Sequence, residues 1–252
     1  MADSSIKAFI QTDQAFLPQL SIDCVIFGYH DNQLKVLLLE FRRVGLCGLP
    51  GGYVFQDEDL DQAAKRILAE RTGLTQIYLD QFGTFGKRNR TDGNFHEQLL
   101  SAMGEPLPDN HWITKRFVSI GYYALLDYSK ANPTPDVFSE SCGWFDIAQL
   151  PPLIFDHAEI VQKALDMLRI MLDYKLIGFN LLPKLFTMSE LQGVYETILG
   201  RKLQRTNFQR KILSMNILVR EQKKYGGGSH KAPYLYRFDT AYEAQVALEP
   251  VV

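Results

Sequence analysis

The sequence has no apolar run that approaches the roughly 20 residues needed to cross a bilayer. Residues 1–19 contain two aspartates and no apolar core flanked by basic residues, so they do not resemble a signal peptide. Cys24, Cys47 and Cys142 are odd in number and far apart, which argues against both a disulfide framework and a clustered metal site. These absences favour a protein of the reducing cytoplasm that does not associate with membranes.

Metal-binding patterns and internal repeats are also missing. The histidines, whose spacing is not typical of metal ligands, are His30, His96, His111, His157 and His230. His157 follows a helix-capping residue, a place where a structural role is more common than a ligand role. We therefore expect neither a resident metal nor another cofactor.

Composition and charge indicate a folded protein with two contrasting parts. Apolar residues make up 46% of the 252 residues and charged residues 22%, which is typical of globular domains with a core. The net charge of −2 hides a basic segment between Lys184 and Phe238, with 11 Lys and Arg against 3 Asp and Glu, a net of +8. This asymmetry favours contact with a polyanion, although charge alone fits a solvated basic face equally well.

Hydrophobic periodicity predicts strands and a helix early in the chain. Apolar runs at 21–27 and 34–39 predict two buried strands joined by a turn at 30–32. Apolar residues at helical spacing predict a helix over 60–71 that Gly73 stops.

The remainder of the first domain alternates strands with polar segments. Further strands are expected over 77–85, 117–126 and 141–146. The stretch 91–115 is rich in Gly, Pro and Asn, so we expect a surface excursion there. Asp156 and Glu159 form a capping-box pattern for a helix that closes the domain.

The segment GYVFQDEDLDQAAKRILAERTGL resembles the Nudix signature, which is Gly, five residues, Glu, seven residues, then Arg-Glu-aliphatic-x-Glu-Glu-x-Gly-aliphatic. The matching positions are Gly52, Glu58, Arg66, Leu68, Glu70, Gly73 and Leu74. Such a match over so many fixed positions is specific. The resemblance implies a Nudix-like α/β/α sandwich with a mixed sheet.

Two mismatches in this box matter for chemistry. In Nudix hydrolases, the Glu after the Arg and the last Glu of the signature hold a divalent cation against a pyrophosphate. Here those positions are Ile67 and Arg71, and an Arg repels Mg²⁺. Glu70 alone is a poor Mg²⁺ site. We therefore expect a protein that is not an enzyme; the alternative is a Nudix hydrolase of ADP-ribose-like nucleoside diphosphate derivatives.

A pocket without catalytic groups can still bind a ligand, and the Arg71 guanidinium suits phosphate or carboxylate oxygens. For most of the arginines a solvated surface role is the alternative, and Arg66, Glu58 and Glu70 fit a brace for the loop as well. The candidate effector-binding residues are Arg42, Arg43, Gly51, Gly52, Glu58, Arg66, Glu70, Arg71, Arg88 and Arg90.

The basic segment begins with two helical patterns. A capping box at 187–190 opens one helix, which Gly200 stops, and a second box at 206–209 opens another that runs to about Met215. Two helices joined by a short turn, with polar and basic side chains on one face of the second, indicate a helix-turn-helix.

A wing is expected after these helices. Strands are predicted over 217–221 and 234–238, with a basic, glycine-rich tip at 223–228. The alternatives are a protein-binding helical module and, with less support, RNA binding. The candidate DNA-binding residues are Lys202, Arg205, Thr206, Asn207, Arg210, Lys211, Lys223 and Lys224.

Residues 180–213 are similar to the winged helix of Nudix-related transcriptional regulators of the NrtR type, and 155–159 resemble the junction in that family. The resemblance covers residues 21 to about 240. It implies a homodimeric repressor or activator that binds a near-palindromic operator in double-stranded DNA and senses an ADP-ribose-type nucleotide or a pentose. Sugar or NAD metabolism would be the setting.

The combined prediction is an α+β chain with a Nudix-like sandwich followed by a winged helix-turn-helix domain. Its expected parts are an N-terminal tail (1–20), an effector-sensing domain (21–174), a DNA-binding domain (175–243) and a C-terminal tail (244–252). The expected function is effector-controlled transcription regulation. A non-enzymatic adaptor is a third hypothesis, which affinity for duplex DNA separates from the first.

Overall fold

The computed structural model describes residues 6–9, 11, 15–75, 77–91, 94–172, 181–224 and 232–239. It divides into two compact units: residues 1–28 with 35–167, and residues 29–34 with 168–252. The predicted domain boundary at 174–175 lies outside the described residues.

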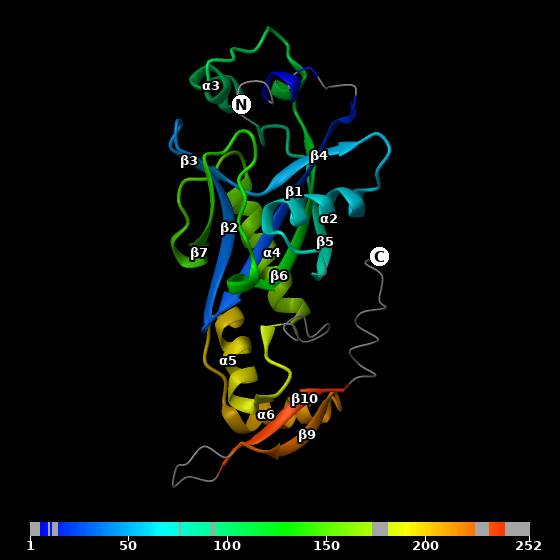
Figure 1. The fold of residues 1–252 in the computed structure, drawn as a ribbon, viewed down its shortest axis with the longest axis vertical. Helices are drawn as coiled ribbons and strands as arrows, with labels where there is room; N and C mark the ends of the chain where they lie inside the picture. Colours follow the sequence, from blue (N-terminus) through cyan, green and yellow to red (C-terminus); the bar gives the residue numbers. More distant parts are fainter. Residues whose placement is uncertain are drawn as a thin grey trace. The chain divides into compact units, whose positions relative to one another are not determined.

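A seven-stranded sheet forms the centre of the first unit (Figure 1). Its strands are β1 (Phe16–His30), β2 (Gln33–Phe41), β3 (Leu46–Gly48), β4 (Gly51–Phe55), β5 (Leu79–Phe85), β6 (Val118–Asp127) and β7 (Ser141–Asp146). The main order is β3-β2-β1-β6-β5, while β4 pairs with β1 and β7 pairs with β2. All five strands predicted from hydrophobic runs are present.

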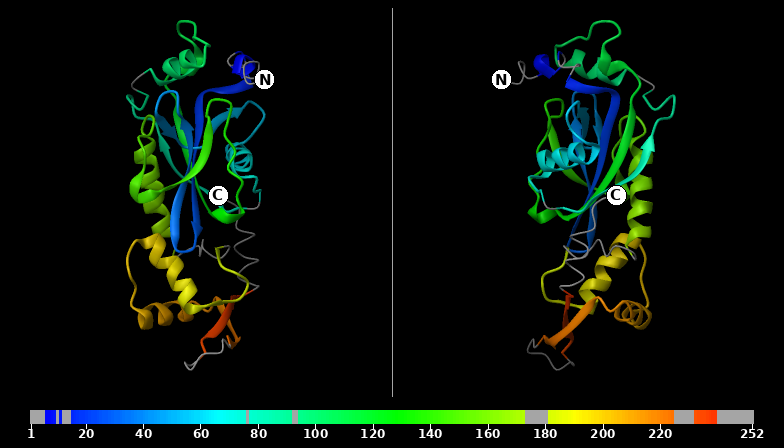
Figure 2. Two further views of the ribbon diagram at one scale, coloured as in Figure 1. Left: turned by 60° about the vertical axis from the view of Figure 1, so that its left-hand side comes forward. Right: turned by 90° about the vertical axis from the view of Figure 1, so that its right-hand side faces the viewer.

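Helices cover both faces of this sheet, as the predicted sandwich requires. In the two views of Figure 2, α2 (Leu60–Thr72) and α4 (His157–Met171) lie on opposite sides of the strands. Ala63, Ala64 and Ile67 of α2 are buried in the core that the helix forms with the sheet. The helix ends as predicted, because Gly73 takes a left-handed φ of 73° and its amide donates to the Ala69 carbonyl.

Two segments of the first unit differ from the prediction. Residues 16–20, expected in an N-terminal tail, form the beginning of β1, and residues 6–9 are helical. The stretch 91–115, expected as a surface excursion, contains α3 (Phe95–Ala102) and a 3-10 turn, η2 (Trp112–Thr114). The surface prediction is wrong for α3, because Leu99 and Leu100 are buried.

The second unit contains the predicted winged helix. Its elements are β8 (Phe186–Thr187), α5 (Met188–Leu199), α6 (Arg205–Ser214), β9 (Leu218–Lys223) and β10 (Tyr234–Phe238). The three strands form one sheet in the order β8-β10-β9. The Tyr195 ring of α5 packs edge-on against Phe208 of α6, with centroids 5.1 Å apart. No helix among the described residues is long and apolar enough to cross a membrane.

One predicted capping box of this unit is present and the other is not. The Thr187 hydroxyl accepts from the Glu190 amide at 3.2 Å, and the Glu190 carboxylate accepts from the Thr187 amide at 2.6 Å. The second box was predicted to open a helix at Thr206. Instead, α6 begins two residues earlier, with Gln204 as N-cap and Arg205 as its first residue, so Thr206 lies inside the first turn.

Candidate functional site

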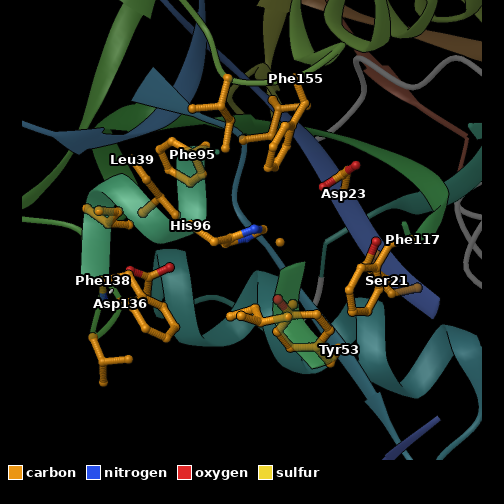
Figure 3. A pocket seen from close by; sticks show the side chains of 18 of the residues that line it. Ser21, Asp23, Leu39, Tyr53, Phe95, His96, Phe117, Asp136, Phe138 and Phe155 are labelled. Carbon is orange, nitrogen blue, oxygen red and sulfur yellow. Dashed lines mark hydrogen bonds between the residues drawn. The ribbon is translucent and has the colours of Figure 1, made fainter. Parts of the chain in front are cut away.

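A cavity of about 570 Å³ lies within the first unit. Its wall includes residues of β1, β2, β4, α2 and α3, together with the segments 135–138 and 154–157. Figure 3 shows aromatic rings and a few polar side chains around this space. A cavity of this size and mixed character is suited to a small organic ligand.

One side of the cavity carries a buried ionic network. The Arg90 guanidinium donates to Asp23 Oδ2 at 3.0 Å and to Asp156 Oδ1 at 3.0 Å, and its side chain is 3% exposed. The Asp156 carboxylate, which was predicted to cap α4, thus accepts hydrogen bonds from Arg90. The carboxylate of Glu159, the other residue of that capping-box pattern, pairs with Lys87 and Lys163. Carboxylates on two sides hold the Arg90 side chain in one position at the cavity wall.

His157 completes this wall in a structural role, as its place in the sequence indicated. Its Nδ1 accepts from the Leu49 amide at 3.0 Å, and its Nε2 lies 3.6 Å from Asp23 Oδ1. Burial lowers the pKa of His157, which favours the neutral ring. The imidazole therefore fixes the backbone that precedes β4.

The three charged residues retained from the Nudix box brace one another. The Arg66 guanidinium pairs with the Glu58 carboxylate at 2.5 Å, donates to the Tyr53 carbonyl at 2.9 Å and lies 3.5 Å from Glu70. Burial acts to raise the pKa of Glu58, but hydrogen bonds from Arg66 and the Phe55 amide outweigh it and lower the pKa. These contacts hold the loop between β4 and α2.

The two positions that depart from the Nudix signature have different surroundings. Ile67 is 1% exposed, and a Cβ on Gly52 would lie 3.2 Å from its Cδ1. Its side chain therefore fills the space beside the box glycine. The Arg71 guanidinium, one turn further along α2, donates to the Thr134 carbonyl at 3.1 Å and to Glu70 at 3.2 Å.

The structure brings part of the predicted effector set to the cavity. The members that line it are Gly51, Gly52, Arg66, Glu70, Arg71 and Arg90. Glu58 lies behind them through its pair with Arg66. Arg42 donates to Ser141 Oγ, Arg43 to the Ala102 carbonyl, and Arg88 is exposed. The last three were predicted to surround the cleft but do not line this cavity, because a position near a strand end does not fix where a side chain points.

An aromatic cluster on the cavity wall was not predicted. Phe9 packs edge-on against Phe138 with centroids 4.9 Å apart, and lies 5.7 Å from both Phe16 and Tyr53. His96 of α3 also faces the cavity. No local sequence pattern identifies these residues, since they come from five separate segments of the chain.

The second unit presents the predicted DNA-binding residues on its surface. All eight are exposed, whether on α6, in the turn before it or on the wing. Arg210 and Asn207 share a face of α6 and are joined by a 3.2 Å hydrogen bond. Lys202 pairs with Glu196 at 2.7 Å, and Lys224 lies 3.4 Å from Glu190. The wing tip at 225–231 lies outside the described residues.

These two units define a class of protein: a Nudix-fold domain followed by a winged helix domain. The NUDIX domain family model matches residues 17–164, and the model of the NrtR DNA-binding winged helix domain matches residues 178–238. The chain belongs to the NrtR family, whose solved members include NrtR of Shewanella oneidensis. That structure is 30% identical, with a TM-score of 0.65, over 88% of this chain and 94% of its own.

Two further similarities extend over nearly the whole chain. The ADPR responsive transcriptional repressor NtrR of Acinetobacter baylyi is 29% identical over 93% of this chain and 91% of its own length. Shewanella oneidensis NrtR in complex with a 27mer DNA is 29% identical, with a TM-score of 0.65, over 90% of this chain and 96% of its own. The similarity thus spans both units.

Proposed function

We propose that this chain is an ADP-ribose-responsive transcriptional repressor that binds duplex DNA through α6 and the wing. The full-length similarity to the ADPR responsive repressor of Acinetobacter baylyi carries this proposal. The cavity in the Nudix domain supports it, because it offers both aromatic surfaces and arginine side chains to a nucleotide. In this proposal Gly51, Gly52, Arg66, Arg71 and Arg90 contact the effector.

The Nudix helix does not fit the Mg²⁺ that Nudix hydrolases use. A buried Ile67 side chain stands where the first metal-binding carboxylate belongs, and the Arg71 guanidinium stands at the second. Mg²⁺ requires several oxygen ligands in near-octahedral geometry, and Glu70 supplies one carboxylate. We therefore propose that the domain binds its effector without hydrolysing it.

Hydrolysis is tested by incubating the purified protein with ADP-ribose and Mg²⁺ or Mn²⁺ and measuring AMP release. The proposal predicts no turnover in the range of about 1–10³ per second that is common for enzymes. Turnover in that range supports the alternative, a Nudix hydrolase with an appended DNA-binding domain.

We also propose a homodimer on a near-palindromic site, because a two-fold pair of α6 helices requires a two-fold repeat in the DNA. Selection of duplexes from a random-sequence library, followed by sedimentation of the protein–DNA complex, measures both properties. Selected sites without an inverted repeat, or one protomer per duplex, contradict the dimer. The absence of any duplex preference favours the adaptor hypothesis.

A further inference from the structure

The helix α3 forms part of the cavity wall although it lies outside the Nudix box. Phe95, His96, Leu99 and Leu100 all face the cavity from this helix. Leu99 and Leu100 are 3% and 1% exposed, so they anchor α3 in the core. Side chains on an anchored helix hold a more constant geometry than side chains on an exposed loop.

His96 is the polar member of this group. Its ring packs beside Phe95 and Phe155, with a centroid distance of 5.4 Å to each. Figure 3 shows the nitrogen-bearing edge of the ring turned toward the open centre of the cavity. Among the described residues, none forms a hydrogen bond with this ring, so its in-cavity nitrogen is available to a ligand.

The ring is uncharged at neutral pH. Burial, with a smaller effect of His111, lowers the pKa of His96 to about 4. A neutral imidazole offers one hydrogen-bond donor and one acceptor and no positive charge. It is therefore suited to an uncharged polar group of a ligand and poorly suited to a phosphate.

The cations of the cavity are elsewhere. Arg66, Arg71 and Arg90 supply its guanidinium groups, and each already contacts a carboxylate. Aromatic rings from Phe9, Tyr53 and their neighbours provide flat apolar surfaces in the same cavity. A nucleobase combines a flat apolar face with a polar edge of donors and acceptors, which matches an aromatic wall and a neutral imidazole.

We propose that His96 is a specificity-determining residue, which hydrogen-bonds the nucleobase edge of the effector inside the aromatic part of the cavity. This inference rests on the proposed function and deepens it. The helix α3, rather than the Nudix helix, then determines whether a ligand with a base is preferred over a plain sugar phosphate.

Calorimetric titration of the full-length protein with ADP-ribose and, by displacement, with ribose 5-phosphate tests this role. H96F keeps a flat ring but removes both hydrogen-bonding nitrogens, whereas H96Q keeps a donor and an acceptor. We expect H96F to weaken ADP-ribose binding by about 3- to 10-fold, the usual effect of one lost hydrogen bond, and to leave ribose 5-phosphate binding unchanged. H96Q should retain most of the affinity. H30Q, which changes a histidine outside the cavity, is the matched control.

The outcomes separate this inference from the proposed function. If wild-type protein binds ADP-ribose and H96F has the same ratio of affinities for the two ligands as wild type, the role of His96 is overturned. The effector assignment then still stands. An equal loss for both ligands in H96F also overturns contact with the base. Wild-type protein that binds neither compound overturns both proposals.

Discussion

Replacement of Arg90 by methionine should destabilise the first unit strongly. Arg90 lies between Asp23 and Asp156, and the three side chains are 3%, 10% and 11% exposed. Methionine fills much of the space of the arginine but supplies neither charge nor donors. The variant would leave two carboxylates close together in the interior without a cation.

Removing one partner of a buried ion pair lowers the free energy of unfolding by about 3–5 kcal/mol, because the remaining charge stays desolvated and unpaired. We expect the free energy of unfolding to fall by about that amount in R90M, a large share of the roughly 5–15 kcal/mol that stabilises a typical protein. The triple variant D23N/R90M/D156N removes all three charges and should recover most of the loss. R88M changes an exposed arginine two positions away and should cost at most about 0.5 kcal/mol.

Urea unfolding followed by tryptophan fluorescence measures these differences. Both tryptophans, Trp112 and Trp144, lie in the first unit, so the signal reports the unit that contains the network. If R90M and R88M unfold at the same urea concentration, the buried network does not stabilise the fold as argued. A triple variant less stable than R90M contradicts the explanation by unpaired charge.

Three other predictions concern pH, DNA and metal. The pKa of His96 is about 4 in the folded protein, against 6.5 when unperturbed. As the pH drops, His96 therefore takes up a proton in the unfolded chain before it does so in the folded protein. The free energy of unfolding thus falls between about pH 6.5 and pH 4. Melting temperatures at pH 7.5 and 5.0 should therefore differ less for H96F than for wild type, and an equal difference refutes the pKa. In gel-shift titrations, Arg210→Ala should cost about 1–3 kcal/mol on the selected site, whereas Lys223→Ala should weaken binding to all duplexes; the same pattern in both variants contradicts this division. I67E/R71E should have a lower melting temperature than wild type, and Mg²⁺ should raise it again. A melting temperature of the variant that does not change with Mg²⁺ would show that carboxylates at these two positions do not form a metal site.

The parts of the fold that follow from local patterns could be predicted from the sequence. The helix α2 and its stop at Gly73 follow from apolar spacing and the left-handed preference of glycine. The start of α5 follows from the capping box of Thr187 and Glu190. The capping pattern at Thr206 was misleading because Gln204 is the N-cap of α6 and Thr206 lies within the helix.

The candidate site depended on contacts between distant segments, which local patterns do not contain. Arg90 meets Asp23 and Asp156 across 67 and 66 positions of the chain. The stretch that contains α3 was predicted as a surface excursion because it is rich in Gly, Pro and Asn, although Phe95, Leu99 and Met103 recur in it at helical spacing. His96 therefore escaped prediction, although the residues of the Nudix box were found by their spacing.

The central claim is that effector binding in the Nudix domain controls DNA binding, and one titration tests it most directly. Fluorescence anisotropy measures the Kd for a selected, labelled duplex at fixed salt, with and without saturating ADP-ribose. The account predicts that ADP-ribose changes this Kd by about 5- to 150-fold, the usual range of allosteric coupling, and that the duplex changes the Kd for ADP-ribose by the same factor. A Kd for DNA that stays constant while calorimetry shows ADP-ribose bound would contradict the account.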